Sequence, residues 1–173
     1  VDGKKLHMQT LGALAHINYN EPELCSYEQA AGYMRELKLS ASEIEQFFRR
    51  MVFNVPAVNQ DDHVKNVSFL MDKTGKWKLS PAYDITFSYD LKNRWLSAHQ
   101  MLINGKKDHI KLDDIIACGK NMDISLPRIK SIISEVKETV LKWPKIADET
   151  GIKKEIYEGI WSIISATDKE FFD

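Results

Sequence analysis

Residues 59–66 read Asn-Gln-Asp-Asp-His-Val-Lys-Asn, so Asp61 and Asn66 stand in the pattern Asp-x-x-x-x-Asn. This is the spacing of a kinase catalytic loop, in which the Asp accepts the proton of the attacking hydroxyl and the Asn oxygen holds magnesium. Pro56 marks the end of the helix before it, so the loop is expected to hang from a helix end.

A second acidic position follows the loop. Two short apolar runs, 67–71 and 76–79, flank the turn residues 72–75 and predict a β-hairpin. The run Leu79-Ser80-Pro81-Ala82-Tyr83-Asp84 then supplies a carboxylate where kinases place their principal metal-binding Asp. Two acidic sites separated by a hairpin are far more specific than either alone.

These residues resemble the C-terminal lobe of the HipA-like family. The resemblance is carried by three runs, Arg50-Met51-Val52-Phe53-Asn54-Val55, residues 61–70 and Trp77-Lys78-Leu79-Ser80-Pro81-Ala82-Tyr83-Asp84. It extends through residues 99–105 and, more loosely, over almost the whole chain. Members of this family are bacterial serine/threonine kinases, best known as toxins of toxin–antitoxin pairs.

The resemblance implies the fold and the reaction. We expect an α+β domain, mainly α-helical, that spans residues 1–173 and forms a protein-kinase-like large lobe with a short β-hairpin at the catalytic site. ATP and Mg would be its cofactors. The eight glycines never form a Gly-x-Gly-x-x-Gly loop, so the small lobe that covers ATP is expected to be absent from this fragment, which alone would be inactive.

Each site residue has an expected role and an ordinary alternative. Asp61 would position the substrate hydroxyl, whereas a lone Asp usually belongs to a turn or a helix cap. Asn66 and Asp84 would be the magnesium ligands, because a hard cation prefers oxygen donors. The alternative makes Asn66 the start of a strand and Asp84 a turn residue. Asp84 is followed by Ile and Thr rather than Phe and Gly, which departs from the common kinase motif.

His63 and Lys65 belong to the Asp-x-His-x-Lys-Asn pattern that the resemblance implies, so one would contact phosphate and the other would support the loop. Which does which stays open, and His63 could instead tie down the backbone through its ring nitrogens. Asp62 has no partner at catalytic spacing and is expected to be structural or to face solvent. Arg49 and Arg50 either support the loop or form surface ion pairs, and at least one of them is expected to pair at the surface.

Composition narrows the function classes. With 173 residues, 43% hydrophobic content and a net charge of −1, the chain suits one domain and lacks the global cationic field of nucleic-acid binders. Cys25 and Cys118 are far apart, which fits a reducing compartment. No apolar run approaches a membrane span, and no hydrophobic signal segment follows the first lysines, so we expect a cytoplasmic protein without membrane contact.

Periodicity predicts helices over 26–37, 43–52, 112–118, 125–141 and 153–172. The expected signals are a Ser26 cap, a Ser42–Glu45 capping box, a stop at Gly119, a Ser125 cap, and a kink or end at Pro144. Residues 85–95 show no period and are expected to form a loop, where an activation segment would lie.

Partners follow from the resemblance. They are a protein substrate, an antitoxin repressor and through it DNA, and a small kinase lobe from the same or a separate chain. The rival hypothesis is a non-catalytic binding module that docks the antitoxin or another chain. A transition-metal hydrolase built on His63, His99 and His109 is a poor second, because no metal-binding motif has the right spacing.

Overall fold

The computed structural model describes residues 5–172, with side chains through residue 167. The first four residues, on which the expectation about a signal segment partly falls, and Asp173 lie outside the described residues. Within that part, seven α-helices and one three-stranded sheet make an α+β fold that is mainly helical, as expected. The elements are β1 (His7–Thr10), α1 (Leu11–Leu14), α2 (Tyr27–Glu36), α3 (Ala41–Asn54), β2 (Ser68–Met71), β3 (Trp77–Leu79), α4 (Leu112–Asn121), α5 (Leu126–Val140), α6 (Trp143–Glu149) and α7 (Lys154–Phe172).

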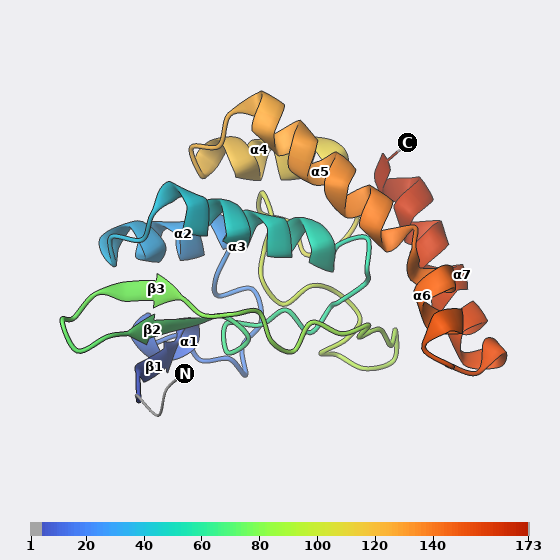
Figure 1. Cartoon of the computed structure of the whole chain (residues 1–173), viewed down its shortest axis with the longest axis horizontal. Coiled ribbons are helices and arrows are strands. Elements are labelled where there is room, and N and C mark those ends of the chain that lie inside the picture. Colours follow the sequence, from blue (N-terminus) through green and yellow to red (C-terminus); the bar gives the residue numbers. More distant parts are fainter. Residues whose placement is uncertain (1–4, 173) are drawn as a thin grey trace.

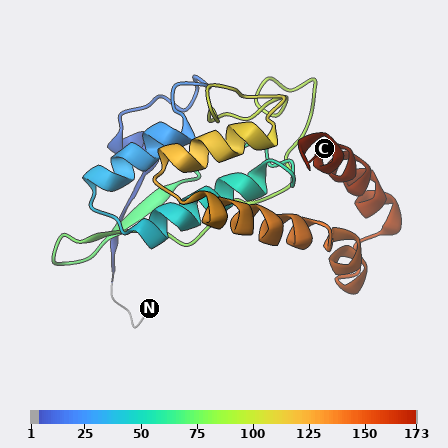
Figure 2. The same cartoon turned by 90° about the horizontal axis from the view of Figure 1, so that it is seen from above.

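The helices form layers above the sheet. Figure 1 shows α2 and α3 over the strands, with α4 and α5 stacked above them and α6 with α7 at one end. Seen from above, α2, α3, α4 and α5 lie side by side (Figure 2). Helix α3 is the central element, because it contacts α2, α5 and β3. The segment that directly follows α3 therefore starts from a central helix of the fold.

Helix α3 has the apolar face that its sequence predicts. Ile44, Phe47, Phe48, Met51 and Val52 are all buried. This amphipathic stripe is the reason that α3 packs centrally.

The capping box of α3 begins two residues earlier than predicted. Ser40 is the N-cap, and its backbone N–H donates to a carboxylate oxygen of Glu43 over 2.9 Å. The predicted pair, Ser42 and Glu45, is therefore wrong, although the same Ser-x-x-Glu pattern occurs at both places. The backbone N–H of Leu79 in β3 donates to the other oxygen of Glu43 over 2.9 Å, which ties the helix start to the sheet.

The helix α2 cap is confirmed. The Ser26 side chain accepts from the Gln29 N–H, and the Gln29 side chain accepts from the Ser26 N–H. Ser125 precedes α5 as predicted, but without a side-chain hydrogen bond. Pro144 lies in the first turn of α6, so the long helix ends before it.

The predicted hairpin forms, but it belongs to a sheet of three strands. β2 pairs antiparallel with β3, with Phe69 opposite Leu79. β1 pairs antiparallel with the other edge of β2, with Gln9 opposite Phe69. β1 was not predicted, because its four residues pair with a strand that is distant in sequence.

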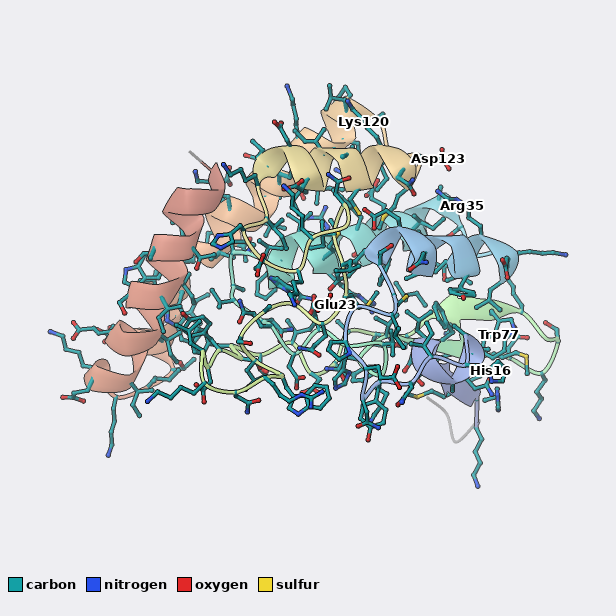
Figure 3. All side chains as sticks on the ribbon, turned by 180° about the vertical axis from the view of Figure 1, so that it is seen from behind. His16, Glu23, Arg35, Trp77, Lys120 and Asp123 are labelled. Atoms are coloured by element: carbon teal, nitrogen blue, oxygen red, sulfur yellow. The ribbon has the colours of Figure 1, made fainter. Side chains whose placement is uncertain are left out.

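Gly119 does not end α4, which continues to Asn121. A Cβ on this glycine would lie 2.7 Å from Ile129 Cδ1 and 2.9 Å from Phe48 Cε2. The absence of a side chain therefore permits close packing of α4 on α5 and α3, and the prediction of a C-cap was wrong. Arg35 on α2 also reaches this corner, where its guanidinium lies 2.8 Å from the Asp123 carboxylate (Figure 3).

Among the residues that the structure describes, no helix is both long enough and apolar enough to cross a membrane. Cys25 and Cys118 are free and buried. Burial, with the nearby Glu28 carboxylate, raises the pKa of the Cys25 thiol to about 11.

Candidate functional site

The loop 59–66 leaves the C-terminal end of α3, as predicted. Val58, just before it, has a φ of 55°, a conformation that a β-branched residue rarely adopts. The Asn66 side-chain amide donates to the Asp61 carbonyl over 2.8 Å, and the Asn66 backbone N–H donates to the His63 carbonyl over 2.8 Å. The loop is thus closed by its own asparagine, which links the two ends of the Asp-x-x-x-x-Asn pattern.

The segment that carries Asp84 is held against this loop before and after the aspartate. Before it, the Tyr83 hydroxyl donates to the Lys65 carbonyl over 2.5 Å, and the Ser80 N–H donates to the Ser68 carbonyl over 2.9 Å. The Tyr83 and Ser68 hydroxyls are also hydrogen-bonded to each other. This places Tyr83 against the residue that precedes Asn66.

After the aspartate, the same segment is bonded to the start of the loop. The Gln60 N–H donates to the Ser88 carbonyl over 3.0 Å, and the Ser88 N–H donates to the Val58 carbonyl over 3.0 Å. Asp84 therefore lies midway along a segment whose two ends are bonded to the two ends of the loop 59–66. The predicted loop at 85–95 contains no helix or strand.

Asp84 itself adopts a φ of 54°, in the left-handed region that Asp tolerates better than most residues. Sparsely populated backbone conformations of this kind cluster at functional sites. Among residues 5–167, no hydrogen bond or ion pair occupies the Asp84 carboxylate or the Oδ1 atom of Asn66. Both groups are hard oxygen donors, which is the donor type that magnesium prefers. No group of three or more His, Cys, Asp and Glu side chains in the described residues is arranged to hold a metal.

The Asp61 side chain is 39% exposed and lies near His63, whose Nε2 is 3.8 Å from its Oδ1. That distance is too long for a hydrogen bond. The Nδ1 atom of His63 is buried without a hydrogen-bond partner in the described structure, so the ring does not tie down the backbone. Asp61 thus keeps a solvent-accessible carboxylate beside an imidazole.

Tyr19 is a neighbour of this loop that sequence reasoning missed. The Lys65 ammonium lies 3.6 Å from the centroid of the Tyr19 ring, a cation–π contact. The same ring meets His63 edge-on at a centroid distance of 6.1 Å. Tyr19 therefore contacts both basic residues of the loop. No sequence signal connected it with them.

Asp62 is buried, so the structural reading is correct and the solvent-facing one is wrong. Its side chain is 1% exposed. Oδ2 accepts from the Tyr27 hydroxyl over 2.8 Å and lies 3.0 Å from His99 Nδ1, while Oδ1 accepts from the Gln100 N–H over 2.8 Å. The neighbour of Asp61 is thereby anchored to α2 and to the segment 99–100.

The anchor continues into α3. The Asn54 side-chain amide donates to the Tyr27 hydroxyl over 3.0 Å, and the Asn59 amide donates to Asn54 Oδ1 over 3.0 Å. Burial, followed by the Asp62 charge, raises the pKa of the Tyr27 hydroxyl well above its usual range. Tyr27 therefore stays a neutral donor. His99, considered above as a metal ligand, instead belongs to this buried network.

The two arginines of α3 divide between the two expected roles. Arg49 pairs with Glu135 of α5 at 2.7 Å, which is an ion pair between partly exposed side chains. Arg50 donates to the Ser80 carbonyl over 2.6 Å and so supports the segment that leads to Asp84.

Comparison with known proteins identifies the class. Residues 2–144 match the model of the HipA-like C-terminal domain, so the chain belongs to that family. A similar fold occurs in the solved complex of the Shewanella oneidensis MR-1 toxin–antitoxin system HipA and HipB with its operator DNA. The TM-score is 0.64 at 15% sequence identity, over 98% of this chain and 44% of that one. The chain thus spans less than half the length of that relative. No curated protein sequence matches it.

Proposed function

We propose that this domain is the catalytic large lobe of a HipA-like serine/threonine kinase, the toxin of a toxin–antitoxin pair. It would transfer the γ-phosphoryl group of ATP to a hydroxyl of a protein substrate. The small lobe that covers ATP would come from the same or a separate chain.

One observation carries the proposal. The segment around Asp84 is bonded on one side to Lys65 and Ser68 and on the other to Val58 and Gln60. Asp61, Asn66 and Asp84 are thereby borne on two adjoining segments, although the hairpin separates them in sequence. Phosphoryl transfer depends on such positioning more than on a strong base.

The site side chains would have separate roles in the reaction. Asn66 and Asp84 would hold Mg²⁺, which neutralises charge on the transferring phosphates when bound. Asp61 would orient the substrate hydroxyl and accept its proton through the exposed carboxylate. Lys65, held over the Tyr19 ring, and His63 are the basic groups available to a phosphate.

The test replaces Asp61 and Asp84 separately by Asn in the full-length protein that contains this domain. We expect each change to lower the rate of transfer from labelled ATP by at least about 10²-fold, since each removes a charge that the reaction requires. Asp113→Asn, at an exposed position in the first turn of α4, is the control and should retain activity. Activity that survives both site changes would refute the proposal.

We further propose that the domain takes part in docking an antitoxin repressor and, through it, operator DNA. The solved relative is a HipA and HipB complex with DNA, which supports this assignment. Co-purification of the full-length protein with the product of a neighbouring repressor gene would test it. Binding that persists in the inactive Asp61→Asn variant would show that docking is separate from catalysis, whereas no complex at all would refute the docking proposal.

A further inference from the structure

A cavity of about 510 Å³ lies between α3, α5 and the residues on either side of Asp84. Gln46, Arg50 and Phe53 line it from α3, and Ala82 and Ile85 line it from the Asp84 segment. Glu135 and Val136 line it from α5. None of the five proposed site residues contributes to its wall, and its size is typical of small-molecule sites, which span roughly 300–1,000 Å³.

The charges in this wall leave one cation without a partner. Arg49 is neutralised by Glu135, with 2.7 Å between the guanidinium and the carboxylate. Arg50, by contrast, has no carboxylate partner among the described residues. The wall therefore carries one net positive charge, located on Arg50.

Arg50 also has unused hydrogen-bonding capacity. A guanidinium offers five N–H donors, and the described structure uses one of them, in the 2.6 Å bond to the Ser80 carbonyl. Burial lowers the pKa of Arg50, so its charged form is less stable here than in water. An anion in the cavity would supply both the missing charge and the missing acceptors.

The remainder of the wall favours an apolar body on that anion. Phe53, Ile85 and Val136 line the cavity with apolar side chains. A purely ionic ligand would leave their apolar surface exposed to water, whereas a ligand with an apolar group would bury it. We propose that this cavity binds a small organic anion, a carboxylate joined to an apolar group. This goes beyond the proposed kinase activity and does not depend on it.

Phenylbutyrate and its neutral amide, phenylbutyramide, form a matched pair of probes. Each is titrated into the protein while backbone amide shifts are followed by two-dimensional NMR. We expect saturable shifts at Ala82 and Ile85 with the carboxylate, and affinity lower by about tenfold with the amide, because a charge-assisted bond to Arg50 is lost. Equal affinity of the two probes, or shifts confined to other regions, would overturn the proposal.

Two variants distinguish a change of charge inside the cavity wall from an equal change in the net charge of the protein. Gln46→Glu places a carboxylate in the wall at an exposed helix position and should weaken phenylbutyrate binding at least about fivefold by neutralising Arg50. Lys130→Gln, exposed on α5 and outside the wall, changes the net charge by the same amount and should bind normally. If the two variants weaken binding equally, the site is not at Arg50. Unchanged amide spectra away from the cavity would show that both variants fold.

Discussion

Asp61 and Asp62 are adjacent in the chain and have opposite surroundings. Asp61 is 39% exposed, whereas Asp62 is 1% exposed and accepts hydrogen bonds from Tyr27 and Gln100. The exposed carboxylate of Asp61 is accessible to a substrate, whereas the buried carboxylate of Asp62 connects segments of the fold through hydrogen bonds. The difference allows the stability contribution of the buried Asp62 network to be measured against an exposed neighbour.

We expect Asp62→Asn to lower the free energy of unfolding by about 2–3 kcal/mol, because an amide N–H₂ would face donors in a buried network. Asp61→Asn is the matched control and should cost no more than about 0.5 kcal/mol, as at most exposed positions. Urea unfolding at neutral pH measures both. Equal costs would mean that the Asp62 network contributes little stability.

Asp114 provides a prediction about pH. Burial alone would raise the pKa of its carboxyl, but hydrogen bonds from the Lys111 N–H, the Asn104 amide and the Lys106 ammonium, each 2.9 Å long, lower it on balance. A lowered folded pKa stabilises the protein above the unfolded value of about 3.9, and this contribution disappears as the pH falls through the folded pKa.

The Asp114→Asn variant lacks this titration. We therefore expect it to be less stable than the parent protein at pH 7, by about 1–3 kcal/mol, and the gap to narrow as the pH drops below about 4. Urea unfolding of the two proteins at a series of pH values gives the gap directly. A gap that stays constant across that range would contradict the assignment of these bonds to the ionised carboxylate.

At the scale of the element, glycine has opposite consequences in two helices. Gly119 in α4 has Ile129 and Phe48 where its Cβ would be, at 2.7 and 2.9 Å. Gly32 in α2 has no atom within 4 Å of that position apart from its chain neighbours and the backbone of its own helix. Alanine gains about 1 kcal/mol of helix propensity over glycine in either helix, so only the packing differs.

We expect Gly119→Ala to destabilise the protein by about 1–2 kcal/mol net, because crowding in a packed core outweighs the propensity gain. Gly32→Ala should instead stabilise it by up to about 1 kcal/mol. Thermal unfolding of the two variants gives the sign of each effect. If Gly119→Ala also stabilises, Ile129 must be able to move aside.

Local patterns predicted much of the architecture. Helical periodicity located α2, α3, α4, α5 and α7, and the turn residues 72–75 located the β2–β3 hairpin. The elements that were missed depend on non-local or very short features. β1 pairs with a strand some sixty residues away, and α1 and α6 span only Leu11–Leu14 and Trp143–Glu149. Periodicity carries little information about elements that are this short or that depend on distant partners.

The candidate site shows the same division. Spacing predicts Asp61, Asn66 and Asp84 as a set, because those residues lie in short motifs, and their catalytic roles stay a prediction. It did not show that Asp62 meets Tyr27 and His99, since contacts between segments that far apart follow from the assembled fold. Tyr19 was missed for the same reason.

The whole molecule has a central and a peripheral part. α3 is packed between the sheet and α5, and its side chains Phe48, Met51 and Val52 have no exposed surface. α6 and α7 contact each other at one end of the molecule (Figure 1), and α7 reaches the core through the buried side chain of Ile164. They also lie almost wholly beyond the residues 2–144 that match the family model. Regions with fewer buried contacts open at a lower free energy than the core.

Hydrogen exchange should reveal this division. We expect the amides of α3 to exchange only through global unfolding, and those of α6 and α7 to exchange by local opening that costs less free energy. Mass spectrometry of exchanged peptides at increasing urea concentration distinguishes the two, because local opening depends only weakly on denaturant. Peptides from α2 and α5, which contact α3 directly, are the internal control and should follow α3. If α7 is protected as strongly as α3, the C-terminal helices are part of the same cooperative unit, and the packing seen between α6 and α7 understates their attachment to the core.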